Sequence, residues 1–357
     1  MEELLTIQRH AGLNHFLKVA KLPGVIATPR HHLSMRASGR IHENLKARSG
    51  SPKTVRIFNC TLAALTTAIA LSFSSLPLHS SEETRNDLIG ANGYYRVREG
   101  ETLLEIARLH DFGFIELISA NPGMDPWVPE PGRTVLLPGQ HILPDAPRQG
   151  IVINRPELRL YYYPGNGQPP VTYPIGVGRL GRETPLGTTF IAAKRDKPIW
   201  TPPPSIRAER PELPATVPSG PDNPLGLFAL NLGWRNYVIH GTNKPYGIGR
   251  RVSSGCIRLY PEDIEQLFQI IDVGTPVRVV DQETKIGWSA GELYLEIHPS
   301  VAEGDELEQK GWYMATPVSG LKERLQQAAG IHAARIDWSA VDKAEKAKRG
   351  TPLRITQ

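Results

Sequence analysis

The sequence predicts a mainly β protein that carries a small α/β unit on its N-terminal side. Glycine and proline are frequent, with 33 and 32 residues among 357, whereas aromatic residues make up only 7%. This composition favours short strands joined by turns over a helical bundle. From Ile151 onward, runs such as "IVIN", "FALNL" and "YVIH" alternate with turn residues, which predicts a β-sandwich or barrel. At this length we expect two or three domains.

The N-terminal part predicts export. Residues 1–59 hold ten of the 41 Lys and Arg but only three of the 36 acids, so the remainder carries 31 basic and 33 acidic residues. The basic excess therefore lies in this leader (1–56), and the rest of the chain has none. Nucleic-acid binding would need a basic face on the folded part, so this function is not expected. The following run, "IFNCTLAALTTAIALSFSSLPL", contains no charged residue. We therefore expect residues 57–80 to be a signal peptide or a membrane anchor.

A compact unit is expected at residues 92–140. Thr102, followed three residues later by Glu105, is a capping-box signature for the start of a helix in "TLLEIARLHD", and "FIELISAN" predicts a second helix. The opening "YRVREGETL" resembles that of a LysM module. The resemblance implies a βααβ fold that binds glycan containing N-acetylglucosamine; the alternative is a packed α/β unit without a ligand.

Later segments suggest a lid and a C-terminal extension. The stretch from 198 to 224 holds nine prolines, and a stiffened loop of this length is expected to form a wall or lid over a cleft. Residues 261–272, "PEDIEQLFQIID", predict a helix with Pro261 in its first turn. Residues 283–357 form a C-terminal extension, partly helical, that shows no signature of chemistry.

One thiol stands out in "VIHGTNKPYGIGRRVSSGCIRL" (238–259). If Cys60 leaves with the apolar run, Cys256 has no disulfide partner, so an exported chain must use it or bury it. His240 closes a β-like run and a glycine-rich loop follows, so the imidazole can reach the thiol and take its proton. The backbone N–H groups of Gly255 and Cys256 suit an oxyanion hole, and Arg258 suits a substrate carboxylate.

The same residues allow other interpretations. A His and a Cys near each other are often packing residues. Two such ligands without a further Cys or His cluster fall short of a zinc site, so no metal or cofactor is expected. The string "GIGRRVSSG" lacks the G-K-[ST] ending of a phosphate-binding loop.

The full string changes this balance, because "HGTN" followed by "SSGCIRL" resembles the signature of the L,D-transpeptidases of YkuD or ErfK type. "IVINRPELRLYYYP", "YPIGVGRLGRETPLGTTFIAAK" and "GTPVRVVD" add matches in the expected order, over residues 150–282. The resemblance implies a YkuD-type β-sandwich with a short helix. Ser254 stands where many members have His, which we interpret as tuning of the site.

The resemblance implies a periplasmic enzyme in which Cys256 attacks a peptidoglycan stem tetrapeptide and releases D-Ala. His240 would move the proton, and the Gly241 carbonyl would orient His240. The acceptor is either a second stem, giving a 3→3 cross-link, or a lysine of a lipoprotein. The alternatives are a hydrolase of the same fold and a non-catalytic peptidoglycan-binding adaptor. Further candidate substrate-binding residues are Ser253, Ser254, Tyr246, Arg251 and Trp200.

Overall fold

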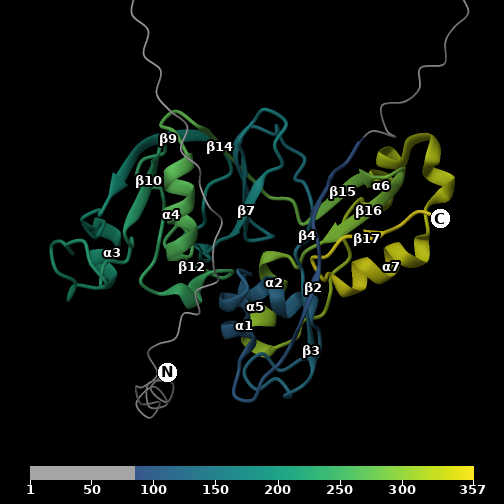
Figure 1. The fold of residues 1–357 in the computed structure, drawn as a ribbon, viewed down its shortest axis with the longest axis horizontal. Coiled ribbons are helices and arrows are strands. Elements are labelled where there is room, and N and C mark those ends of the chain that lie inside the picture. Colours follow the sequence, from purple (N-terminus) through teal and green to yellow (C-terminus); the bar gives the residue numbers. More distant parts are fainter. Residues whose placement is uncertain (1–84) are drawn as a thin grey trace, which may run out of the picture. The chain divides into compact units, whose positions relative to one another are not determined.

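The computed structural model describes residues 85–357 (Figure 1). The basic leader 1–56 and the expected signal or anchor at 57–80, with Cys60, lie outside the described residues. Among residues 85–357, none of the helices combines the length and the apolar character that crossing a bilayer requires.

The first part of the described chain is a small unit of strands and helices. Strand β2 (Gly93–Arg96) pairs antiparallel with β3 (Thr134–Leu137), and β1 (Leu88–Gly90) pairs with β4 (Gln140–Ile142). Helices α1 (Leu103–Leu109) and α2 (Phe114–Ala120) follow β2. The capping box expected at Thr102 and Glu105 is formed, with both reciprocal hydrogen bonds at the start of α1. Apolar side chains of β2, α1, α2 and β3 share one buried cluster.

The largest sheet has eight strands and mixed direction. In sheet order the strands are β13 (Ile257–Arg258), β11 (Val238–His240), β10 (Phe228–Leu232), β9 (Gly187–Asp196), β14 (Pro276–Val280), β5 (Gly150–Asn154), β6 (Arg159–Tyr163) and β7 (Val171–Pro174). Its parallel pairs are β11 with β13 and β14 with β5, and every other neighbouring pair is antiparallel. Helix α4 (Pro261–Ile270) packs near β10, and a separate parallel pair joins β8 (Val177–Gly178) to β12 (Arg251–Ser253).

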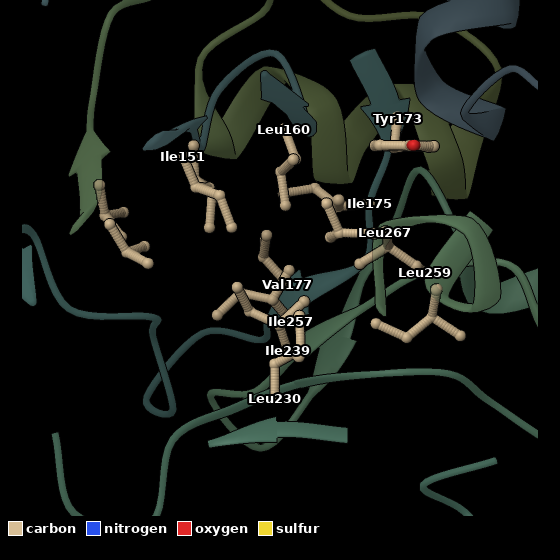
Figure 2. Packing of buried hydrophobic residues seen from close by; sticks show 14 of the residues in the cluster. Ile151, Leu160, Tyr173, Ile175, Val177, Leu230, Ile239, Ile257, Leu259 and Leu267 are labelled. Atoms are coloured by element: carbon tan, nitrogen blue, oxygen red, sulfur yellow. The ribbon is translucent and has the colours of Figure 1, made fainter. Parts of the chain in front are cut away.

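The mainly β character expected for this region is confirmed, but one curled sheet replaces the two layers of a sandwich. Ile151 and Leu160 come from strands β5 and β6, and Leu230 and Ile239 come from β10 and β11 beyond the middle of the sheet. All four belong to one buried cluster (Figure 2). Strand twist accumulates across eight strands, so a single sheet can curl until distant strands share a core.

The proline-rich stretch is a closed loop that connects β9 to β10. It contains the short helix α3 (Pro204–Glu209), and an isolated bridge joins the backbones of Trp200 and Val217. Asn223 is fully buried at the base of the loop. Its side-chain amide donates to the carbonyls of Pro198, Val217 and Pro218 at 2.8–3.2 Å, which draws the two ends of the loop together.

The C-terminal residues have a core of their own, except for α5 (Val301–Lys310), whose Leu307 packs in the cluster of the N-terminal unit. Strands β15, β16 and β17 form a three-stranded sheet, and α6 and α7 pack on it around a separate apolar cluster. The partly helical extension expected here therefore contains a packed three-stranded sheet as well as helices (Figure 1). The elements are β15 (Thr284–Ser289), β16 (Glu292–Ile297), α5 (Val301–Lys310), α6 (Leu321–Ala329), the 3₁₀ helix η4 (Gly330–Arg335), α7 (Trp338–Ala347) and β17 (Leu353–Arg354).

The N-terminal unit is joined to the loop between β11 and β13 through backbone. The N–H groups of Phe114 and Ile115, at the start of α2, donate to the carbonyls of Ile248 and Gly249 at 3.4 and 3.1 Å. Gly249 has a φ of +72°, and a Cβ there would lie 2.1 Å from the Phe114 nitrogen. Only glycine permits both this conformation and this approach. The 3₁₀ helix η3 (Pro245–Gly247) lies just before this contact.

Candidate active site

His240 and Cys256 are brought together by two neighbouring parallel strands. In the pairing of β11 with β13, His240 is the register partner of Arg258. Side chains alternate along a strand, so Cys256, two positions before Arg258, lies on the same face as His240. Both side chains line one cleft.

The imidazole of His240 is buried and held in one tautomer. Its Nδ1 lies 2.5 Å from the carbonyl oxygen of Gly241. A carbonyl only accepts, so Nδ1 carries the proton and Nε2 is left as a base. Burial, aided by the charge of Arg258, lowers the pKa of His240 to about 3, against the opposing effect of the Gly241 contact. The ring is therefore neutral at physiological pH.

The thiol of Cys256 is half-buried and its hydrogen bond does not go to His240. The recorded partner of Sγ is the carbonyl oxygen of Asn236, at 3.7 Å. Burial raises the pKa of the thiol, and this outweighs a backbone hydrogen bond at Val238 and the charge of Arg258, which lower it. The pair is thus a neutral thiol beside a neutral imidazole.

The backbone around the thiol is fixed by two hydroxyl contacts to Ser253. The N–H of Gly255 donates to Ser253 Oγ at 3.2 Å, and Ser253 Oγ donates to the Cys256 carbonyl at 2.5 Å. The Gly255 N–H is therefore engaged, contrary to the expectation that it would serve an oxyanion hole. Within residues 85–357 the N–H of Cys256 has no recorded acceptor. It is the remaining candidate donor.

The cleft in front of the thiol has a volume of about 440 Å³, and the proline-rich loop forms part of its wall, as its composition predicted. Trp200 and Ile206 of that loop line it. Glu209, at the end of α3, forms ion pairs with Arg179 and Arg182. Arg182 lines the cleft as well, so these ion pairs connect the loop to another part of the cleft wall. The cleft therefore lies between two walls joined by ion pairs.

Arg258 has a guanidinium without a carboxylate partner among the described residues. It lines the cleft and also an adjoining pocket of about 300 Å³ beyond Trp200 and Ser254. Its buried Nε has no hydrogen-bond partner within residues 85–357, and burial lowers its pKa. A desolvated cation of this kind suits an anionic ligand group.

The other predicted pocket residues divide into two groups. Ser253, Ser254 and Trp200 line the cleft. Tyr246 and Arg251 do not: Tyr246 lines a separate surface pocket beside α1, and Arg251 donates to the carbonyl of Arg155. Their prediction as pocket residues is corrected. The glycine-rich loop turns toward the N-terminal unit at this point, and so carries both side chains away from Cys256.

One cluster offers metal-ligand atoms, but a side-chain cation already occupies it. His141, Glu157 and Glu296 are buried with ligand atoms within 4.8 Å of one another. The Nζ atom of Lys285 lies 2.8 Å from Glu157 Oε1 and 2.8 Å from Glu296 Oε1. The ammonium group therefore neutralises the carboxylates that a metal ion would need.

Sequence reasoning missed the residues on the turn before β11. Arg235, Asn236 and Tyr237 line the cleft, and Asn236 contacts the thiol. The turn "GWRNY" carries no motif that indicates this role. Only the pairing of β11 with β13 places it beside Cys256.

Comparison with known proteins assigns this fold and site to a class of enzymes. Residues 148–279 match the family described as YkuD, L,D-transpeptidase catalytic domain. The chain is 45% identical over 226 residues to "Probable L,D-transpeptidase YcfS" of Escherichia coli K12, covering 60% of this chain and 71% of that protein. It is 40% identical over 282 residues to "Probable L,D-transpeptidase YbiS" of the same strain, covering 75% and 88%. The chain therefore belongs to the L,D-transpeptidase family.

Among solved structures, the catalytic domain from the E. faecium L,D-transpeptidase, determined by NMR, overlaps 38% of this chain and 100% of its own. The identity is 21% and the TM-score 0.31.

Proposed function

We propose that the protein acts on the stem tetrapeptides of peptidoglycan through a thioester on Cys256. The observation that carries this proposal is the shared cleft of a thiol and a neutral, single-tautomer histidine. The proton of the thiol passes to His240 Nε2 as sulfur attacks the carbonyl carbon of the third stem residue. The tetrahedral oxyanion collapses, and the D-Ala amine leaves with the proton from His240.

The second half of the reaction reverses these roles. An acceptor amine enters the cleft, gives a proton to His240 and attacks the thioester carbonyl, and the thiol is regenerated. The amine of a second stem would give a 3→3 cross-link, whereas a protein lysine would attach a lipoprotein. The cationic walls of the cleft, which include Arg182, Arg235 and Arg258, support an anionic peptide as the donor.

The N-terminal unit is proposed to be a LysM module that binds the glycan of the same polymer. Its order of strand, helix, helix and strand fits that expectation. Trp127 and Val128, in the segment between α2 and β3, are exposed apolar side chains, and sugars stack well on such surfaces. Together with the expected signal or anchor at 57–80, a glycan-binding unit supports the proposal that the protein acts in the periplasm.

Incubating the protein with purified disaccharide-tetrapeptide, beside Cys256→Ala, tests the proposed reaction by mass spectrometry. We expect an acyl adduct on the parent with loss of D-Ala, a dimeric product, and neither in the variant. Resolution to the tripeptide alone would indicate the hydrolase, or a missing lysine acceptor. Glycan binding without any adduct on the parent would indicate a non-catalytic adaptor.

Arg258→Gln tests the proposed carboxylate contact. A hydrogen bond to a charged group contributes about 1.5–3 kcal/mol, so we expect the KM for the tetrapeptide to rise about tenfold or more. Arg235→Gln is the matched control, because Arg235 lines the same cleft but is exposed. Its KM should change by less than about threefold, as an exposed charge contributes less than about 1 kcal/mol. Equal effects in the two variants would contradict a specific contact at Arg258.

A further inference from the structure

Thr184 makes two hydrogen bonds next to the segment that carries the thiol, and no motif in the sequence marks it. Its side chain is only 1% exposed. The hydroxyl donates to the carbonyl oxygen of Gly255 at 2.9 Å and accepts from the N–H of Gly178 at 3.2 Å. Because a hydroxyl has a single hydrogen, these two partners fix its direction.

We propose that Thr184 is a positioning residue that aims the backbone N–H of Cys256 at the developing oxyanion. This inference rests on the proposed acyl transfer at Cys256. A trans peptide is planar, so the Gly255 carbonyl and the Cys256 N–H point in opposite directions. Holding the carbonyl toward the buried Thr184 turns the N–H away from it. That N–H has no recorded acceptor within the described residues, so it is available to a substrate oxygen.

The surroundings leave this peptide dependent on Thr184. Gly255 has a φ of +104°, and a Cβ there would lie 2.9 Å from Tyr237 Cε1. The first residue of the Gly255–Cys256 peptide therefore has no side chain that could restrict the orientation of this peptide plane. The contacts of Ser253 go to the Gly255 N–H and the Cys256 carbonyl, which belong to the two neighbouring peptides. The Gly255 carbonyl is held by the Thr184 hydroxyl.

The test compares two reactions of the same thiol. Acylation by disaccharide-tetrapeptide, followed in a single turnover, develops an oxyanion, whereas alkylation by iodoacetamide does not. Thr184→Val removes the hydroxyl at similar size, and Thr184→Ser keeps it. Since loss of one oxyanion donor costs about 10²–10³-fold in rate, we expect Thr184→Val to slow acylation at least about tenfold. Alkylation should stay within about twofold of the parent, and Thr184→Ser should recover most of the acylation rate.

Three outcomes would overturn the inference. If Thr184→Val slows both reactions equally, the residue supports the cleft in general and does not aim a donor. If the parent is acylated and Thr184→Val is acylated as fast, the inference fails while the proposed function stands. If the parent forms no adduct on Cys256, the proposed function fails and the inference falls with it.

Discussion

Exchanging His240 for glutamine should lower kcat for the proposed transpeptidation by about 10²–10⁴-fold and leave KM within about threefold. General acid–base catalysis by a positioned side chain contributes that much, and a glutamine amide cannot take a proton from the thiol. Glutamine is close to histidine in size and is uncharged, like the neutral ring of His240, so the fold of the cleft should survive. Steady-state rates with disaccharide-tetrapeptide measure the effect.

The matched control is His332→Gln, in η4 of the C-terminal unit, where the ring packs against Trp288. It should leave kcat unchanged. A loss in His332→Gln comparable to that in His240→Gln would mean that histidine replacement acts through stability and not through proton transfer.

The same histidine gives the parent enzyme a pH signature. An ordinary histidine has a pKa near 6.5, but that of His240 is lowered to about 3 by burial. The imidazole therefore stays unprotonated and able to accept a proton far below pH 6.5. We expect no fall in acylation rate with a midpoint near pH 6.5 as the pH is lowered from about 8 to about 5. A fall in acylation rate with a midpoint near pH 6.5 would mean that the His240 ring is exposed to water.

Exchanging Lys285 for methionine should lower the free energy of unfolding by about 3–5 kcal/mol, the cost of breaking a buried ion pair by removing one partner. Its Nζ contacts Glu157 and Glu296, whose side chains are 0% exposed, and the hydroxyl of Tyr161 at 3.1 Å. Methionine fills similar space but removes the ammonium group that lies between the two carboxylates. Urea unfolding at neutral pH, followed by circular dichroism, measures the loss.

Lys310→Met is the matched control. Lys310 pairs with Glu306 one helical turn away at 3.6 Å, with both side chains about half exposed. Such a pair contributes about 0.3–0.5 kcal/mol. If both exchanges cost less than about 1 kcal/mol, the buried cluster does not depend on the ammonium group.

Local features of the molecule could be predicted from the sequence, because they depend on neighbouring residues. The capping box at Thr102 and the strands from Ile151 onward follow from spacing and alternation alone. The pairing of His240 with Cys256 in one cleft was predictable from the motif, since a glycine-rich loop links them. The proline-rich wall of that cleft follows from the stiffness of its composition.

Contacts between distant segments could not be predicted. The buried cluster joins His141, Glu157, Lys285 and Glu296, which the sequence separates by up to 155 positions. No local pattern indicates that these charges meet in one interior. Tyr246 and Arg251 were misplaced for a related reason, because their loop turns toward α2 and away from the thiol. The direction of the Gly255 carbonyl likewise depends on Thr184, 71 positions earlier.

The backbone contact between α2 and Gly249 has a consequence for the product of the reaction. The loop that leads to Cys256 is held by main-chain atoms of the N-terminal unit, and side chains contribute nothing to those two hydrogen bonds. If the N-terminal unit binds a glycan strand, the distance along the strand from the bound sugar to the modified stem peptide is constant. The new bonds would then fall at a regular interval from each binding event, and would not be scattered at random along the polymer.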